Sequence, residues 1–470
     1  MRRAKIVCTL GPATNDQTTI DALVAAGMDC ARLNFSHGTH ESHARAAAMV
    51  RAAASRAGRP LAILADLCGP KMRVGVFPGG PVELVAGARF TLKTRDAPGD
   101  VNGVGVSYAA LAEDVRIGDA ILLDDGLLRL RVDSVVDGDV HCTVEVGGAL
   151  SDKKGLNIPG TPLSTPAVTE KDKEDLVFAV ETLKVEFVAL SFVRRAADVL
   201  EARALAGDTP IIAKIEKPEA IANLDAILDA ADGAMVARGD LGVEMGAEKV
   251  PLLQKRIIRA VNHRGKIVIT ATQMLDSMIR NPTPTRAEAA DVANAVIDGT
   301  DALMLSGETA AGKHPLLAVA MMDKIVREVE DDWQRERKSL TDDGFHAELG
   351  SDWGFADGAA KAAAVLSFAL PMKALVVFTR DGRTARMLSE YRPRAPIVAM
   401  TQESGVANQL ALEWGVIPRV EVPPEIMSET IRIATGLLLR EGICQVGDEF
   451  TLVMGWPPSS GTNTLKLHRI

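Results

Sequence analysis

The sequence lacks the features that mark several classes of protein. Its cysteines are few and scattered, with no CxxC spacing and no paired framework: Cys8, Cys30, Cys68, Cys142 and Cys444. We therefore expect reduced thiols, no zinc site and no disulfide scaffold. No apolar run approaches the ~20 residues that a membrane helix needs. The first residues lack the apolar core and cleavage site of a signal peptide, so a cytoplasmic protein is expected.

The chain also lacks an excess of positive charge. Lys and Arg number 53 against 62 Asp and Glu, which gives a formal net charge of −9. This balance argues against nucleic acid or an anionic membrane as the main partner. The hydrophobic share of 47% and the charged share of 24% are ordinary for a globular protein. A chain of 470 residues is too long for one core, and about three domains are expected.

Short apolar strands alternate with helical segments in two parts of the chain. The expected strands cover residues 5–9, 30–33, 61–65, 187–192, 211–216, a run from 233 to the acid Asp240, 266–272 and 302–305. Strands separated by helices pair in parallel, and about eight of them close a (β/α)8 barrel. Working residues in that fold lie at the carboxyl ends of the strands. The residues found at such ends are Arg32, Asp66, Lys214, Glu216, Asp240, Thr272 and Ser306.

Two further domains are expected from changes in composition and in the predicted secondary structure. Residues 71–154 contain short strands, many glycines and hairpin signals such as Asp124-Asp125-Gly126. A charged helix over 321–338 and a polar stretch over 339–350 precede a last α/β region of typical domain size. The predicted division is barrel over 1–69 and 156–345, an inserted small β-barrel lid over 70–155, and a C-terminal α/β domain over 346–470.

The central constellation is the strand that carries Lys214 and Glu216. Side chains alternate along a strand, so these two project to the same side. Standing alone, the pair would be read as an exposed salt bridge. Asp240 ends the next strand between glycines. Two carboxylates beside a cation predict a site for a hard divalent metal such as Mg²⁺, which leaves positions open for substrate oxygens. Lys214 would then stabilise an enolate or a phosphoryl group in transfer.

Other strand-end residues allow two interpretations each. Arg32 has forked donors that match phosphate oxygens, or it is a helix cap or surface ion-pair partner. Gly239 lets a backbone N–H approach an anionic ligand. Thr272 donates to a substrate carboxylate, caps a helix that begins at Gln273, or does both. Ser306 either contacts the active site or only turns the chain into the last helix.

These residues predict a Mg²⁺-dependent reaction on a small phosphorylated or carboxylated substrate. A phosphotransferase and a metal-dependent lyase or aldolase acting through a pyruvate enolate both fit. A catalytically silent sensor of sugar phosphates is disfavoured by the completeness of the lysine and acid set. The inserted domain favours the phosphotransferase, because phosphoryl transfer benefits from a lid that excludes water.

Several segments in the same order resemble pyruvate kinase along nearly the whole chain. They cover residues 5–14, 32–40, 214–216, 235–242, 270–275, 284–288 and 304–309. The resemblance implies a barrel with an inserted lid, a C-terminal regulatory domain and a homotetramer. It also implies a glycolytic reaction that transfers the phosphoryl group of phosphoenolpyruvate to ADP, giving pyruvate and ATP.

The resemblance assigns roles residue by residue. For metal and substrate it implies Glu216 and Asp240 for Mg²⁺ or Mn²⁺, Lys214 for the transferring phosphoryl and the enolate, Gly239, Asp240 and Thr272 for the carboxylate, and Arg32 for the phosphoryl group. The resemblance does not assign the final proton donor, and a water held near Thr272 and Ser306 is our own hypothesis for it. For the nucleotide it implies Asn34, His37, Arg73 and Arg195. Arg195 stands where the family usually has lysine, so a planar guanidinium with forked N–H donors replaces a compact ammonium group.

The resemblance also bears on a monovalent cation. Most members need K⁺, at positions occupied here by Asn34, Ser36, Asp66 and Leu67. In this chain Lys71 stands where the family usually has glutamate. Its ammonium is expected to lie about 4 Å from Asp66 and to replace the ion, so that K⁺ is not required. The alternative is that Lys71 extends into solvent and K⁺ still binds.

A second ligand is expected in the C-terminal domain. After a predicted strand, a turn opens a helix, a geometry that binds phosphate through backbone N–H groups. The residues are Thr379, Arg380, Asp381, Gly382, Arg383 and Thr384. The family has an effector pocket here, completed by a loop that residues 459–462 resemble, which implies a sugar phosphate or AMP as effector. The alternative is an ordinary helix start.

Overall fold

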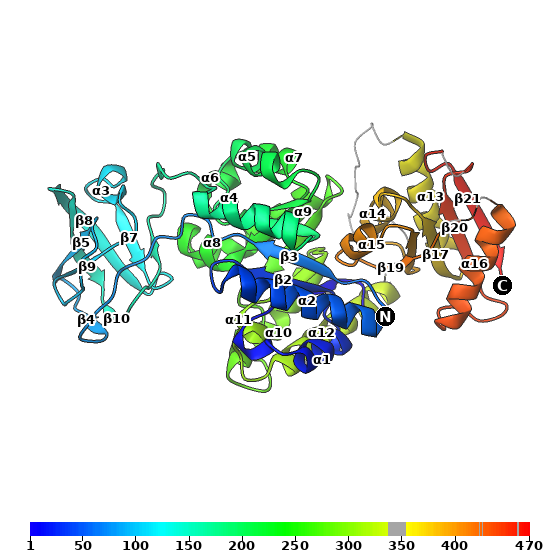
Figure 1. Cartoon of the computed structure of the whole chain (residues 1–470), viewed down its shortest axis with the longest axis horizontal. Helices are drawn as coiled ribbons and strands as arrows, with labels where there is room; N and C mark the ends of the chain where they lie inside the picture. Colours follow the sequence, from blue (N-terminus) through cyan, green and yellow to red (C-terminus); the bar gives the residue numbers. More distant parts are fainter. Residues whose placement is uncertain (337–353, 423, 425, 458–459) are drawn as a thin grey trace.

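The computed structural model describes residues 1–336, 354–422, 424, 426–457 and 460–470, arranged as three parts in a row (Figure 1). A β-rich domain lies at one end, a barrel in the middle, and an α/β domain at the other end. The expected helix end at 338, the polar stretch 339–350 and the predicted domain boundary at 345–346 fall outside the described residues.

The middle part is a closed barrel of parallel strands, which confirms the expected fold class. The eight strands are β1 (Lys5–Thr9), β2 (Cys30–Asn34), β3 (Ala62–Asp66), β12 (Phe187–Leu190), β13 (Ile211–Ile215), β14 (Gly233–Ala237), β15 (Ile267–Ala271) and β16 (Ala302–Leu305). They follow one another around the ring in chain order, and β16 pairs with β1 through Lys5 and Ala302.

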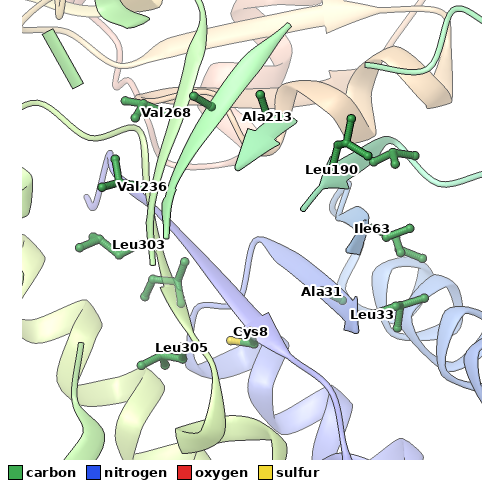
Figure 2. Packing of buried hydrophobic residues seen from close by; sticks show 14 of the residues in the cluster. Cys8, Ala31, Leu33, Ile63, Leu190, Ala213, Val236, Val268, Leu303 and Leu305 are labelled. Carbon is green, nitrogen blue, oxygen red and sulfur yellow. The ribbon is translucent and has the colours of Figure 1, made fainter. Parts of the chain in front are cut away.

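Alternation along these strands produces two apolar sets. One set packs against the helices, and Figure 2 shows part of it, including Cys8, Leu190 and Val236. The other set faces the barrel axis and includes Ile212 and Leu64. Because the side-chain period of a strand is two, the polar residues that follow the inner set on the same strands also point inward.

Helices surround the barrel. They are α1 (Gln17–Ala26), α2 (His40–Ala57), α4 (Glu170–Val177), α5 (Ala196–Ala206), α6 (Pro218–Ala222), α7 (Leu224–Ala230), α8 (Arg238–Met245), α9 (Val250–Asn262), α10 (Arg286–Ile297), α11 (Gly307–Ala310) and α12 (Pro315–Glu336). The side chains of Thr169 and Thr285 cap α4 and α10 in capping boxes. Within the described ranges, no helix has the length and apolarity to cross a membrane.

The inserted domain is a curled half-barrel. Its six-stranded sheet runs in the order β11-β7-β8-β9-β5-β6, and a separate pair joins β10 to β4. Its elements are β4 (Val82–Leu84), β5 (Arg89–Lys93), β6 (Gly103–Gly105), α3 (Leu111–Asp114), β7 (Ala120–Leu123), β8 (Leu128–Val136), β9 (Asp139–Val146), β10 (Gly148–Leu150) and β11 (Leu156–Asn157). The predicted hairpin turns are present, with positive φ at Asp124, Asp125 and Gly126.

The C-terminal domain is a five-stranded mixed sheet in the order β19-β18-β17-β20-β21. Its elements are α13 (Gly354–Ala369), β17 (Met372–Phe378), α14 (Arg383–Glu390), β18 (Ile397–Thr401), α15 (Ser404–Leu410), β19 (Val416–Val420), α16 (Met427–Arg440), β20 (Glu449–Met454) and β21 (Thr464–Arg469). The sequence prediction missed β21, an antiparallel edge strand that is largely exposed and therefore has few apolar residues. Leu412 of this domain is buried with the inner apolar set of the barrel, which joins the two parts.

Candidate active site

Four charged side chains meet on the inner face at the carboxyl ends of the barrel strands. The Lys214 Nζ lies 3.3 Å from Asp66 Oδ1 and 3.7 Å from Glu216 Oε1. The Arg32 Nε lies 2.7 Å from Asp66 Oδ2. Lys214 is only 8% exposed and Glu216 is fully buried. An exposed salt bridge is therefore the wrong interpretation of Lys214 and Glu216, and their shared direction follows from strand alternation.

The charges in this group set one another's protonation. Burial acts to lower the pKa of Lys214, but the carboxylates of Asp66 and Glu216 more than offset it, so the pKa is raised and the ammonium stays charged. Burial acts to raise the pKa of Asp66, yet Lys214, Arg32 and, more weakly, Lys71 hold it below its ordinary value. Asp66 is thus an anion between cations.

Glu216 is the member of the group with unused bonding capacity. Its Oε1 accepts a hydrogen bond from the Phe192 N–H at 2.7 Å, while its buried Oε2 has no hydrogen-bond partner. Burial raises the pKa of Glu216 to about 7, against the opposing charge of Lys214. A buried carboxylate oxygen without a partner is costly unless a cation or proton satisfies it. The residues present therefore fit a divalent cation.

The remaining oxygen donors come from α8 and from the inserted domain. The expectation that Asp240 ends a strand is wrong: β14 ends at Ala237, and Asp240 lies in the first turn of α8, where it lines an open cleft between barrel and lid. Asp125 of the lid lines the same cleft, and burial, with the charges of Asp240 and Asp124, raises its pKa. Among the described residues no group of three or more His, Cys, Asp or Glu side chains is arranged to hold a metal alone. A cation held by Glu216 and Asp240 would thus need oxygens from water or substrate.

Gly239 and Thr272 form one wall of the cleft. A Cβ on Gly239 would lie 2.7 Å from Thr272 Cγ2, so only glycine fits there. Thr272 and Gln273 have φ values of 73° and 54°, and the next helical element is a 3₁₀ turn over Asp276–Ile279. Thr272 is therefore not the N-cap of a helix beginning at Gln273, because left-handed backbone at both residues excludes a helix there.

Arg238 holds this unusual backbone in place. Its Nη2 donates to the Thr272 carbonyl at 2.7 Å, and its Nε donates to the Ala271 carbonyl at 3.2 Å. Its Nη1 lies 2.7 Å from Asp291 Oδ1 on α10. The sequence prediction gave Arg238 no role, although its place directly after a barrel strand was the signal.

Ser306 lies in a turn at the end of β16 that the Glu308 side chain holds in place. Its backbone N–H donates to Glu308 Oε2 at 2.8 Å, and the other oxygen of Glu308 accepts from the Leu275 N–H at 3.0 Å. Glu308 is buried, so it fixes the loops after β15 and β16 to each other. The turn both starts α11 and lies beside the loop that carries Thr272.

The residues predicted for a monovalent cation lie around Asp66. The Leu67 carbonyl accepts a hydrogen bond from the Ser191 hydroxyl at 2.7 Å, and Lys214 Nζ donates to the same hydroxyl at 2.6 Å. Asn34 Oδ1 accepts from the Ser36 N–H at 3.1 Å. Ser191 was missed in the sequence, where it was assigned to the interior of a strand; that strand ends at Leu190.

Lys71 is exposed on the wall of the cleft. Among the ion pairs of the described residues, Asp66 pairs with Arg32 and Lys214 and not with Lys71, so the close pairing of Lys71 with Asp66 expected from the sequence is not found. Lys71 nevertheless acts on its surroundings, since its charge contributes to the low pKa of Asp66. It also contributes, after burial, to the lowered pKa of His37.

The predicted nucleotide residues divide into two groups. Burial lowers the pKa of His37, and the positive charges of Lys71, Arg73 and Arg32 lower it further. Arg73 lies on the segment that leads from the barrel into the lid, which we call the outgoing linker. Its Nη1 donates to the Lys153 carbonyl. The Arg195 side chain is 72% exposed and pairs with Asp198 of its own helix. Among the side-chain contacts of the described residues, none joins Arg195 to His37 or Arg73.

The predicted effector segment has the expected helix start. Gly382 has a φ of 82° and precedes α14, and its N–H donates to Thr379 Oγ1 at 3.0 Å. Thr384 and Thr462, both buried, have their hydroxyl oxygens 2.5 Å apart, so the turn contacts the later loop. Ser459 of that loop lies outside the described residues.

Comparison with known proteins shows that the chain matches a single protein family over nearly its whole length. A model of the pyruvate kinase barrel domain matches residues 1–319, and a model of the pyruvate kinase alpha/beta domain matches residues 357–468. Pyruvate kinases from Geobacillus stearothermophilus and Clostridium perfringens are 45% and 42% identical, over all of this chain and over 80% and 100% of their own lengths. The pyruvate kinase of Mycobacterium intracellulare is 46% identical over all of this chain and 98% of its own length.

Proposed function

The chain belongs to the pyruvate kinase family, and from this premise we propose how its own residues carry out the reaction. It is a phosphotransferase of glycolysis whose substrates are phosphoenolpyruvate and ADP, and its family uses a divalent metal. The full-length match to pyruvate kinases decides against the lyase or aldolase alternative. The roles of individual residues are our proposal.

We propose that Glu216 and Asp240 hold Mg²⁺, with Mn²⁺ able to take its place. The observation that carries this assignment is the buried Glu216 Oε2 without a hydrogen-bond partner, beside the charged Lys214. A divalent cation bound there supplies positive charge to the phosphoryl and carboxylate oxygens of the substrate.

Lys214 then stabilises the charge that the reaction moves. As the phosphoryl group passes from the enol oxygen to ADP, negative charge develops on the transferring oxygens and on the enolate left behind. The Lys214 ammonium is held in place by Ser191 and Asp66 and loses little freedom in the transition state. Arg32, fixed by Asp66 and Thr9, presents its remaining guanidinium N–H groups to the phosphoryl group.

The substrate carboxylate is assigned to the cleft wall that Gly239 and Thr272 form. Backbone N–H groups of Gly239 and Asp240 lie at the start of α8, where anions are favoured. The Thr272 hydroxyl is presented by a backbone that Arg238 braces. Thr272 and Ser306 are assigned to hold the water that protonates the enolate.

ADP is assigned to the cleft between lid and barrel. Asn34, His37 and Arg73 are assigned to it from the barrel and the outgoing linker, and the exposed Arg195 is assigned to it as well. The inserted domain closes over the reacting groups and excludes water, which would otherwise compete with ADP for the phosphoryl group.

The assay that tests this function mixes the protein with phosphoenolpyruvate, ADP and Mg²⁺. A phosphotransferase forms ATP and pyruvate in equal amounts. Pyruvate formation without ATP, or no reaction, would contradict the proposal.

We propose further that K⁺ is not required. Both oxygens of Asp66 are paired with cationic side chains, the Leu67 carbonyl has a partner in Ser191, and Lys71 adds charge nearby. Activity measured with Mg²⁺ and a tetramethylammonium salt is expected to equal activity with KCl at the same ionic strength. Strong activation by KCl would show that Lys71 leaves the cation site to K⁺.

The matched variant is Lys71→Glu. It replaces the local ammonium by a carboxylate without touching the Asp66 pairs. We expect the variant to be weak in tetramethylammonium and to recover in KCl, because a bound cation then offsets the added charge. Equal responses of wild type and variant to KCl would remove Lys71 from the explanation.

We propose a phosphorylated effector, a sugar phosphate or AMP, at residues 379–384. The support is the turn at Gly382, the start of α14 and the contact of Thr384 with Thr462. Sugar phosphates and AMP, titrated at sub-saturating phosphoenolpyruvate, are expected to change the rate in the wild type and not in Thr384→Glu, whose carboxylate repels a phosphate. A silent panel together with a silent variant would show that the segment is only a helix start.

The homotetramer and the cytoplasmic location stay predictions from the sequence. Measurement of the molar mass in solution tests the first. Cell fractionation tests the second.

A further inference from the structure

A buried polar cluster lies beside the candidate metal site and has no part in the mechanism above. Lys217 follows Glu216 in the chain and is buried. Its Nζ lies 2.6 Å from Glu244 Oε1 on α8, and the two side chains are 4% and 1% exposed. Asp240 is on the same helix, one turn before Glu244. The ion pair therefore joins the segments that carry the two proposed metal ligands.

Asn157 connects this ion pair to the lid. Its Nδ2 donates to the same Glu244 Oε1 at 2.9 Å, and the residue is buried. Asn157 belongs to the linker that returns from the lid, within β11, which pairs with β7 of the lid sheet. The neighbouring Leu156 N–H donates to the Met72 carbonyl of the outgoing linker at 2.9 Å. The contact at Glu244 thus holds both linkers.

Phe192 closes the cluster from the other side. The Lys217 Nζ lies 5.5 Å from the centre of the Phe192 ring, a cation–π distance. A Cβ on Gly69, at the start of the outgoing linker, would lie 2.6 Å from the same ring. Phe192 has a φ of 57°, and its N–H donates to Glu216 Oε1 at 2.7 Å. A non-glycine residue in this backbone region is strained and persists only where its surroundings hold it.

We propose that Asn157, Lys217 and Glu244 are positioning residues that, with Phe192, fix the lid linkers to the segments bearing Glu216 and Asp240. We call these four residues the hinge latch. This proposal rests on the proposed roles of Glu216 and Asp240 as metal ligands. The hinge latch sets the separation of the two carboxylates while it anchors the lid, so the geometry for the cation and the attachment of the lid depend on the same contacts. Partners behind metal ligands commonly change metal affinity ~10–100-fold when they are lost.

The first test is Asn157→Leu, which removes the tether and keeps the Lys217–Glu244 pair. Mn²⁺ binding is measured by electron paramagnetic resonance without substrate, and hydrogen exchange is followed at residues 71–75 and 153–158. We expect the Mn²⁺ dissociation constant to rise ~10-fold or more and exchange to accelerate in both linkers.

A matched control distinguishes positioning from simple stability. Asn262 is buried to the same degree as Asn157 and donates through Nδ2 to the Gly299 carbonyl at 3.0 Å. Asn262→Leu is expected to lower the melting temperature and to leave Mn²⁺ affinity and linker exchange unchanged. If Asn157→Leu matches this control in both measurements, the hinge latch is only a structural contact and the proposal is wrong.

The double variant Lys217→Met/Glu244→Leu tests the ion pair. Removing both charges avoids an unpaired buried charge, so stability is expected to stay near that of the wild type. Mn²⁺ affinity is still expected to fall, because the tether to Asn157 is gone. Normal affinity and normal linker exchange would overturn the proposal.

Glu216→Gln tests the proposed function separately, since this variant must abolish Mn²⁺ binding. Whatever the result for Glu216→Gln, hydrogen exchange in the linkers of the hinge-latch variants decides whether the hinge latch exists.

Discussion

Replacing Lys214 by methionine is expected to lower kcat by about 10²–10³, the scale seen when one electrostatic stabiliser is removed from an active site. Methionine keeps the apolar stem and deletes the ammonium that lies between Asp66 and Glu216. Negative charge on the transferring phosphoryl group and the enolate then loses its nearest fixed protein cation. The KM for phosphoenolpyruvate is expected to change much less, because Arg32 and the wall at Thr272 remain.

A surface lysine provides the control. Lys173 on α4 pairs with the exposed Glu170, and such pairs contribute little. Lys173→Met is expected to keep kcat within a factor of two or so of the wild type. Near-normal turnover in Lys214→Met would contradict the role given to Lys214. An equal loss in both variants would show that the effect is not specific to the site.

Replacing Arg392 by methionine is expected to destabilise the protein by about 3–5 kcal/mol, the cost of breaking a buried ion pair at one partner. The Arg392 Nη2 lies 2.6 Å from Asp301 Oδ1, and the side chains are 3% and 1% exposed. Asp301 directly precedes β16 of the barrel and Arg392 follows α14, so the pair joins barrel and C-terminal domain. Without Arg392, the buried carboxylates of Asp301 and Glu390 lose a cation that now opposes the rise of their pKa values.

Urea unfolding followed by tryptophan fluorescence measures this effect, since Trp414 lies 4.6 Å from the Arg392 guanidinium. The control is Arg440→Met, which removes an exposed pair with Glu421 in the same domain and is expected to cost at most about 1 kcal/mol. Adding Asp301→Asn to Arg392→Met should recover part of the loss. Equal stability of Arg392→Met and Arg440→Met would contradict the buried-pair account.

Local patterns were enough to predict the barrel. Strands such as 211–216 are short, apolar and separated by helices, and eight of them at this spacing close a ring. Strand alternation also placed Lys214 and Glu216 on one side, as their 3.7 Å separation shows. The hairpin signals at Asp124 to Gly126 predicted turns correctly, because few residues other than Gly, Asn and Asp adopt positive φ easily.

Long-range contacts could not be predicted in the same way. Ser191 was assigned to a strand interior, and its bond to Lys214 depends on the packing of two different strand ends. Arg238 braces residues 34 positions later in the chain. The double positive φ at Thr272 and Gln273 has no local signature, since neither residue type favours it. The position of Lys71 on the cleft wall likewise depends on how the lid sits.

The central claim is that Glu216 and Asp240, with Lys214 beside them, make this chain a metal-dependent phosphotransferase. The most direct measurement is ATP formation from phosphoenolpyruvate and ADP as Mg²⁺ is titrated, in the wild type and in Glu216→Gln. The account predicts that the wild type forms ATP only when Mg²⁺ is present, and that Glu216→Gln loses most of its activity and needs far more Mg²⁺. ATP formation with the same Mg²⁺ dependence in both proteins would contradict it.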